Sequence, residues 1–121
     1  MQLVRTILFA KEMERMTAFY AETLGLRRMP DRAQPGWEEL DAGGVSLALH
    51  AVPAEIATRI AIEEPAVPRG ETPIKLVFRV ANLEAERGRL VAAGVRMGEV
   101  RAWGGCDGID PEGNVFQLVG T

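Results

Sequence analysis

Few side chains in this chain have types suited to chemistry, and they lie far apart in the sequence. His50 is the single histidine and Cys106 the single cysteine, while Arg5, Lys75 and Gln117 place polar groups in apolar surroundings. An imidazole transfers protons near neutral pH. One imidazole without nearby carboxylate or thiolate partners does not build an ordinary catalytic metal site. These residues therefore favour binding or proton transfer over metal chemistry.

His50 and Cys106 each have two interpretations. His50 is either an acid or base inside a cavity or a strand-end histidine at the cavity rim or in solvent. Cys106 lies within Gly104-Gly105-Cys106-Asp107-Gly108, where small residues let another group approach the backbone closely. It is a nucleophile if His50 or Arg101 activates it, and otherwise it packs as a small apolar side chain.

Two tryptophans are candidates for holding a flat ligand. Trp37 and Trp103 are predicted in matching late strands of the two halves of the chain. Aromatic walls bind flat molecules, but tryptophan is also a large packing residue, so both roles stay open.

Length, composition and charge bound the class of protein. The 121 residues suit one domain that buries its core without disulfides, and 26% charged and 47% hydrophobic residues are ordinary for a globular protein. A net charge of −3 gives no support for nucleic-acid binding. No apolar run is long enough to cross a membrane, and Met1 leads into a predicted strand without signal-peptide features. We therefore expect a cytoplasmic protein with no membrane or nucleic-acid partner.

Hydrophobic periodicity predicts the elements that position these residues. Apolar residues recur every three to four positions from Lys11 to Leu24, which indicates an amphipathic helix that Gly25 ends. Alternation and β-branched residues predict strands over 3–9, 37–41 and 45–52, the last two joined at Gly43-Gly44. A Pro-rich connector follows over 53–73, and Pro53 opens one helical turn.

The second half of the chain repeats the first. Leu8 aligns with Phe78, Gly25 with Gly94, and Gly44 with Gly113, at a nearly constant offset of 69 or 70 residues. The repeat predicts a strand over 74–80, a helix over 83–93 and further strands over 95–100, 103–109 and 115–119. A duplicated unit implies two similar sheets.

The stretch from Asp110 to Val119 combines a turn and a strand. Asp-Pro followed by Gly-Asn is dense turn chemistry. The strand that follows puts Val115, Gln117 and Val119 on one face, so Gln117 is an uncharged amide in an otherwise apolar strand.

Arg5 and Lys75 are predicted to lie on corresponding strands and on the faces away from the helices. Two cations there favour an anionic or carbonyl-bearing ligand. The alternative is that each is neutralised within the chain by Glu39, Asp41 or Asp107.

Two motifs give the chain a resemblance to a known superfamily. The segment from Met13 to Leu26, with Phe-Tyr and Leu-Gly at fixed spacing, and the turn Asp110-Pro111-Glu112-Gly113-Asn114 resemble the vicinal oxygen chelate superfamily of glyoxalases, bleomycin resistance proteins and extradiol dioxygenases. The resemblance implies an α+β fold with two βαβββ modules, a U-shaped mixed sheet lining a cleft, and a homodimer. It gives one domain over 1–121, with module one at 1–52, the connector at 53–73 and module two at 74–121.

The resemblance also allows a test for a metal site. Metal-using members place His or Glu on the first and last strands of each module, and the matching positions here are Arg5, Ala48, Lys75 and Gln117. Cationic side chains repel a divalent ion, and a neutral amide is a weak ligand. We therefore predict no metal and no other cofactor.

Three functions follow as hypotheses. The first is metal-independent binding of a small polar or aromatic, possibly anionic, molecule, with polar contacts from Arg5, Lys75 and Gln117 and apolar walls from Trp37 and Trp103. The second is a metal-independent isomerase or lyase in which His50 or Lys75 transfers a proton while Arg5 stabilises negative charge. The third is a dimeric pseudo-enzyme without a ligand.

Overall fold

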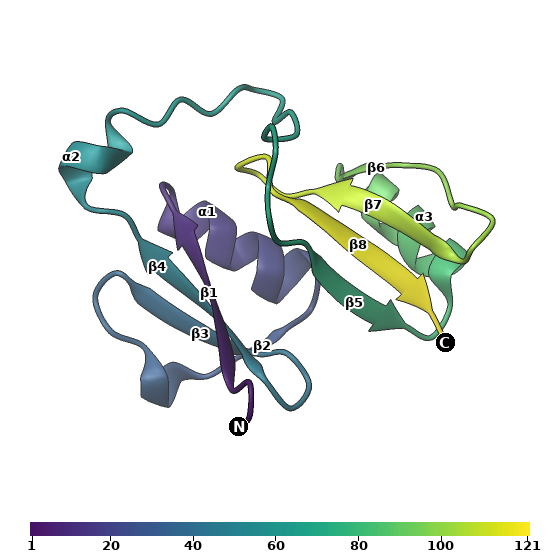
Figure 1. The fold of residues 1–121 in the computed structure, drawn as a ribbon, viewed down its shortest axis with the longest axis horizontal. Coiled ribbons are helices and arrows are strands. Elements are labelled where there is room, and N and C mark those ends of the chain that lie inside the picture. Colours follow the sequence, from purple (N-terminus) through teal and green to yellow (C-terminus); the bar gives the residue numbers. More distant parts are fainter. The chain divides into compact units, whose positions relative to one another are not determined.

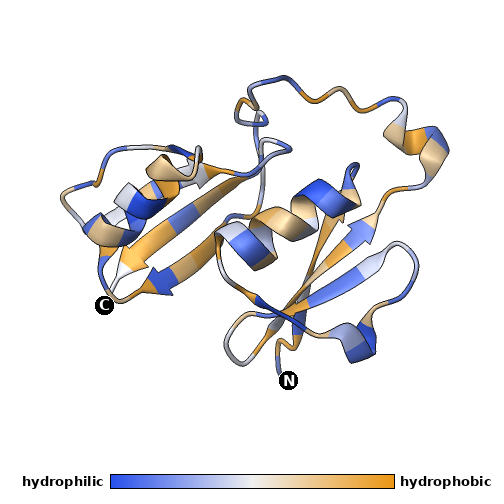
Figure 2. Ribbon diagram, turned by 180° about the vertical axis from the view of Figure 1, so that it is seen from behind, coloured by the Kyte–Doolittle hydropathy of each residue, from blue (hydrophilic) through white to orange (hydrophobic).

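The computed structural model describes residues 1–121 and divides into two compact units, residues 1–61 and 62–121. Each unit contains one four-stranded sheet with a helix packed on one of its faces (Figure 1). Figure 2, seen from behind, shows the longest helix of each unit in front of the strands of that unit. None of the helices has the length and apolar character needed to span a bilayer.

Unit one has the strand order β1-β4-β3-β2, in which β1 runs parallel to β4 and the other pairs are antiparallel. The parallel pair requires a crossover, which the helical segment after β1 begins. Its elements are β1 (Arg5–Ala10), α1 (Met13–Ala18), the π-helix η1 (Phe19–Thr23), β2 (Arg27–Arg28), the 3-10 helix η2 (Pro30–Arg32), β3 (Trp37–Asp41), β4 (Ser46–Ala51) and α2 (Ala54–Ala57).

The core of unit one lies between α1 and one face of the sheet. Leu40, Leu47 and Leu49 are buried there, and Met16 and Tyr20 from the helical segment are fully buried as well. Because side chains alternate across a strand, the opposite face carries every second residue. That face is the one predicted to carry Arg5.

The predicted helix over 11–24 differs from the observed one in its second half. After Ala18 the hydrogen-bonding pattern widens to that of a π-helix, in which the Leu24 amide donates to the Phe19 carbonyl at 2.9 Å. Gly25 has a φ of 86° and the Leu26 amide donates to the Tyr20 carbonyl, so the predicted glycine ending is confirmed. The βαβββ resemblance implied a further strand after the first helix, but the residues of β2 were not predicted, and neither was the helix η2.

Unit two repeats the topology with the strand order β5-β8-β7-β6, and β5 is parallel to β8. Asn82 caps its helix through a side-chain oxygen that accepts from the Ala85 amide. The elements are β5 (Leu76–Val80), α3 (Leu83–Ala92), β6 (Arg96–Met97), β7 (Gly105–Ile109) and β8 (Val115–Gly120).

The fold class predicted from the sequence is confirmed, while several strands are shorter than predicted. The strand expected over 74–80 begins at Leu76, so Lys75 lies just before it. The strand expected over 95–100 pairs only at β6, and the one expected over 103–109 begins at Gly105, so Trp103 lies in the loop before it. The predicted hairpin turn is present, since the Gly113 amide donates to the Asp110 carbonyl at 3.0 Å and Gly113 has a φ of 85°.

Candidate functional site

The predicted site residues of unit one lie on the sheet face away from α1. The register pairs Arg5 with Ser46, Ile7 with Ala48, Phe9 with His50, and Trp37 also with His50. Cross-strand partners share a face. This face therefore brings together Arg5, Trp37 and His50, as the alternation of the strands predicts.

Glu39 is the centre of the polar contacts on this face. Its side chain is only 2% exposed, and its Oε1 accepts hydrogen bonds from Nε and Nη2 of Arg5 at 3.2 and 3.1 Å and from Nη1 of Arg32 at 2.8 Å. The indole N–H of Trp37 donates to Oε2 at 3.4 Å. Arg5 is therefore paired inside its own chain, which is one of the two alternatives left open by the sequence.

These contacts determine the charge of Glu39. Burial by itself raises the pKa of this carboxyl group, but hydrogen bonds from Ser46, Arg32, Arg5 and Trp37 outweigh that effect and lower the pKa to about 2. Glu39 therefore carries its negative charge throughout the physiological range.

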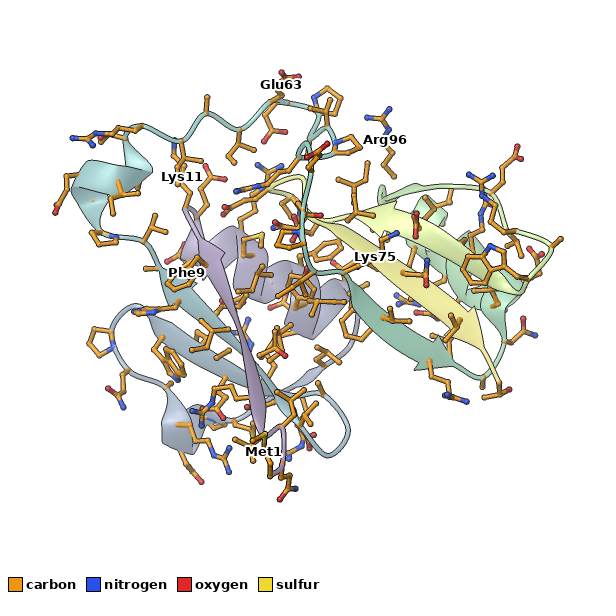
Figure 3. All side chains as sticks on the ribbon, viewed as in Figure 1. Met1, Phe9, Lys11, Glu63, Lys75 and Arg96 are labelled. Atoms are coloured by element: carbon orange, nitrogen blue, oxygen red, sulfur yellow. The ribbon has the colours of Figure 1, made fainter.

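A row of rings crosses the same face. The ring centroids of Phe9 and His50 are 5.5 Å apart, those of His50 and Trp37 are 5.3 Å apart, and the Arg5 guanidinium lies 5.6 Å from the Trp37 centroid. Phe9, labelled in Figure 3, is 57% exposed. These distances allow ring and cation–π contacts, so the row presents an apolar surface beside a guanidinium.

A cavity of about 430 Å³ opens on this side of the unit. Arg27 pairs there with Asp41 at 2.9 Å, and the pKa of Asp41 is lowered by a hydrogen bond from the Gly43 amide and by Arg27. A volume of this size falls in the range of small-molecule sites. Among the residues that line the cavity are Val4, Arg27, Met29, Arg32, Asp41 and Ser46.

In unit two the predicted residues Lys75 and Gln117 converge on Asp107. The Lys75 ammonium lies 3.2 Å from both carboxylate oxygens, and the Gln117 amide nitrogen donates to Oδ1 at 3.0 Å. Figure 3 shows Lys75 beside the strands of this sheet. Lys75, like Arg5, is thus neutralised within its own unit.

Trp103 reaches the same face of unit two from the loop before β7. Two atoms of its ring lie 2.2 and 2.3 Å from the point where Gly105 would carry a Cβ atom. That point faces the same way as the Asp107 side chain, two residues along the strand. The Trp103 ring therefore covers Gly105 on the face that carries Lys75 and Gln117.

The two units present matching groups at matching positions. In each unit, a cation at or just before the first strand pairs with a carboxylate on the third strand, β3 or β7, and an indole lies on the same face. The two tryptophans were predicted in matching strands, but they do not occupy matching positions. The residue of β7 that corresponds to Trp37 is Gly105, and Trp103 reaches this position from the loop before the strand. His50 has no counterpart, since Val119 takes its position.

The four positions that the superfamily resemblance aligns with metal ligands carry side chains here that do not fit a metal. Arg5 and Lys75 are cations engaged in ion pairs, Ala48 offers a methyl group, and the Gln117 amide is bound to Asp107. No group of three or more His, Cys, Asp or Glu side chains gathers to form a metal site. The donor chemistry of these residues is that of hydrogen bonding.

Two of the candidates for proton transfer or nucleophilic attack, His50 and Cys106, lack activating partners. His50 contacts two aromatic rings and makes no ion pair. Cys106 is 1% exposed, and burial raises the pKa of its thiol. The packing role of Cys106 is the one that this environment favours.

Arg32 belongs to the site and was not identified from the sequence. It reaches Glu39 from helix η2, which begins at Pro30. Pro at the first helical position was the available signal. Nothing in the local pattern linked that turn to a buried carboxylate on β3.

The model of the glyoxalase-like domain family matches residues 5–119. No curated protein matches the chain.

Several solved structures are similar over nearly the whole chain. A glyoxalase/bleomycin resistance protein/dioxygenase family enzyme from Burkholderia phytofirmans PsJN has a TM-score of 0.74 and 21% identity, covering 99% of this chain and 98% of that one. TnmS3, an antibiotic binding protein from Streptomyces sp. CB03234, has a TM-score of 0.72 and 23% identity, covering 99% and 95%. A protein of unknown function from Agrobacterium tumefaciens str. C58 has a TM-score of 0.72 and 23% identity, covering 100% and 94%.

At these sequence identities, the similarity to solved structures establishes only the fold. Membership in the family is established by the family model, whose match extends across both units. The chain therefore belongs to the glyoxalase-like domain family, within the vicinal oxygen chelate superfamily that its two sequence motifs resemble.

Proposed function

We propose that this protein binds a small polar or aromatic molecule on the open faces of its sheets, without using a metal ion. The observation that carries the proposal is the pairing of an indole with a cation–carboxylate pair in each unit, Trp37 beside Arg5 and Glu39, and Trp103 over the face of Lys75 and Asp107. An exposed aromatic surface next to fixed polar groups is the ordinary composition of a ligand site.

The proposal of metal independence rests on the donor groups. A divalent ion at these positions would have to displace two cations from their carboxylates and accept an amide and a methyl group as neighbours. Hard and borderline metal ions select carboxylate, imidazole or thiolate ligands instead. The antibiotic binding protein among the similar structures supports a binding role for this fold.

Binding is favoured over the isomerase or lyase alternative because the proton-transfer candidates are poorly placed for it. A general base needs a partner that orients it, and the ring contacts of His50 are with the apolar rings of Phe9 and Trp37. Lys75 is engaged with Asp107. The residues of both units can orient a molecule through hydrogen bonds and stacking.

The test is a binding screen of flat aromatic amides, acids and ketones by tryptophan fluorescence and calorimetry, with and without a metal chelator. We expect saturable binding that the chelator leaves unchanged and that weakens when Trp37 or Trp103 is replaced by alanine. Metal analysis of protein purified without chelators provides the second arm. Stoichiometric nickel, zinc, iron or manganese, or binding that requires added metal, would contradict the proposal.

We also propose that the protein is a homodimer, as the family resemblance implies. Strand β1 is the edge of its sheet, and Leu3, Val4, Ile7 and Phe9 on or before it are exposed. Exposed apolar edge strands associate readily with a second chain. We expect light scattering to give twice the mass of one chain, and a Leu3→Lys and Val4→Lys double variant to shift the protein toward the monomer.

A further inference from the structure

The two cation–carboxylate pairs differ in how easily a ligand can open them. The Glu39 side chain is 2% exposed and holds two guanidinium groups, so removing a partner would leave a buried charge. The Lys75 and Asp107 side chains are 41% and 48% exposed. Because an exposed ion pair adds little to stability, Lys75 can turn from Asp107 to a ligand at little cost.

Gln117 adds a hydrogen-bond acceptor to the site formed by the second pair, Lys75 and Asp107. Its amide nitrogen donates to the same Asp107 oxygen that Lys75 contacts, which fixes the amide and leaves its carbonyl oxygen without a partner in the protein. An ammonium group has three donors, of which Asp107 takes at most two. Asp107 therefore holds one group that keeps a free donor and one that keeps a free acceptor.

The surroundings of this pair limit the charge of the partner. Lys75 and Asp107 cancel each other, so an anion placed near the ammonium also meets the carboxylate. The other cation on this face, Arg79, lies opposite Val119, at the end of the face where Gly105 and Trp103 lie. The Trp103 ring, 62% exposed, lies on the same face beside Gly105 and supplies a flat apolar surface. The combination suits a planar molecule without net charge.

We propose that Lys75, Gln117 and Trp103 select a neutral planar molecule that carries a hydrogen-bond acceptor next to a donor, the arrangement found in a carboxamide or a hydroxy-carbonyl compound. Lys75 donates to the acceptor, the Gln117 carbonyl accepts from the donor, and the ring stacks on Trp103. The inference rests on the proposed binding function and names the ligand class for unit two.

The experiment uses three probes of nearly equal shape: 2-naphthamide, 2-naphthoate and 2-acetonaphthone. Only the amide has an acceptor beside a donor, so we expect it to bind at least about tenfold more tightly than the acid or the ketone. Gln117→Leu should lower the amide affinity about tenfold and leave the ketone unaffected, while Lys75→Met should weaken both. Arg59→Met, which removes an exposed cation of unit one, is the control, and circular dichroism verifies folding of each variant.

The outcomes separate this inference from the proposed function. The inference would be overturned if naphthoate bound more tightly than the amide, or if Gln117→Leu left the affinity for the amide unchanged. The proposed binding function would stand in both cases. Failure of all three probes to bind the native protein would overturn both. A Gln117→Glu variant gives a further measurement. Its carboxylate should still accept a hydrogen bond from 2-naphthamide, but it should repel the negative charge of 2-naphthoate and weaken the binding of that probe.

Discussion

The ring of Trp103 occupies the space in which residue 105 would carry a Cβ atom if it were not glycine. Ring atoms lie 2.2 and 2.3 Å from that point, and the Leu118 carbonyl oxygen lies 3.0 Å from it. We expect Gly105→Ala to displace the Trp103 ring, since a real Cβ atom does not approach other atoms so closely. In a Trp37→Phe background, which leaves Trp103 as the single emitter, the fluorescence spectrum should shift to the red.

Gly120→Ala is the matched control for that substitution. Gly120 lies on β8 of the same sheet, and an added Cβ atom would meet only Leu83 at 3.8 Å, an ordinary contact. The control should leave the emission spectrum in place. An unchanged spectrum for Gly105→Ala would show that Trp103 does not rest on this strand in solution.

The stability of the protein should depend on pH through Glu39. Its pKa in the folded state is about 2, below the ordinary value of 4.5, so the ionised form stabilises the fold above pH 4.5 and this contribution is lost between pH 4.5 and 2. The shift corresponds to about 3 kcal/mol, which solvent screening at the exposed arginines reduces to about 1–2 kcal/mol. Urea unfolding at pH 7, 4 and 3 measures the loss.

Glu39→Gln provides the comparison for this pH dependence. Removing the carboxylate leaves Arg5 and Arg32 without their partner, so we expect the variant to be about 2 kcal/mol less stable at pH 7. The difference from wild type should narrow as the pH falls. Glu38→Gln, on the same strand, is the control, and a gap between wild type and Glu39→Gln that stays constant from pH 7 to 3 would contradict the assignment.

Much of the fold could be predicted from the sequence because its signals are local. Alternation and turn residues correctly predicted β3 over 37–41 and the hairpin turn at Asp110 to Asn114. Strand β2 was missed because two residues, Arg27 and Arg28, carry no periodicity of their own and become a strand only by pairing with β3. The π-helix at Phe19 was missed for a similar reason, since no local pattern distinguishes it from an α-helix.

The candidate site was predictable in its residues but not in its pairings. The repeat placed Arg5 and Lys75 on equivalent strands, which needs only the period of two. The partner of Arg5 is Glu39, 34 residues away, and the sequence left Glu39, Asp41 and Asp107 as alternatives. Pairing depends on strand order and register, and those emerge only when the whole sheet is assembled.

The thiol of Cys106 should be unreactive in the folded protein. Burial raises its pKa and also blocks access, so neither the thiolate nor a path to it is available. We expect 5,5′-dithiobis(2-nitrobenzoic acid) to react with Cys106 only as denaturant unfolds the chain. In a Thr121→Cys variant, whose added thiol is exposed, one of the two thiols should react at once. Rapid reaction of the native protein would instead indicate an activated cysteine.

The connector segment before β5 is held on the hairpin turn of unit two, and Gly113 makes this contact possible. The Arg69 amide donates to the Gly113 carbonyl at 2.8 Å, and Arg69 Nε donates to the Glu112 carbonyl at 2.9 Å. A Cβ atom on Gly113 would lie 2.3 Å from the Val67 carbonyl oxygen, and the φ of 85° already disfavours any other residue. We expect Gly113→Ala to cost at least about 2 kcal/mol of stability.

The same substitution should release the connector to a protease. Trypsin cleaves after arginine in segments that detach from the fold. Arg69 is held by Glu112 and Gly113, whereas Arg59 is exposed. In the native protein, trypsin should therefore cleave after Arg69 more slowly than after Arg59. Gly113→Ala should raise the rate of cleavage after Arg69 relative to the rate after Arg59. Global unfolding would expose both sites, so the ratio of the two cleavage rates distinguishes local release of the connector from unfolding of the whole chain. Gly88→Ala, where an added Cβ atom meets nothing within 4 Å, should leave the ratio unchanged. Equal cleavage at both arginines in the native chain would mean that the connector is not held by the turn.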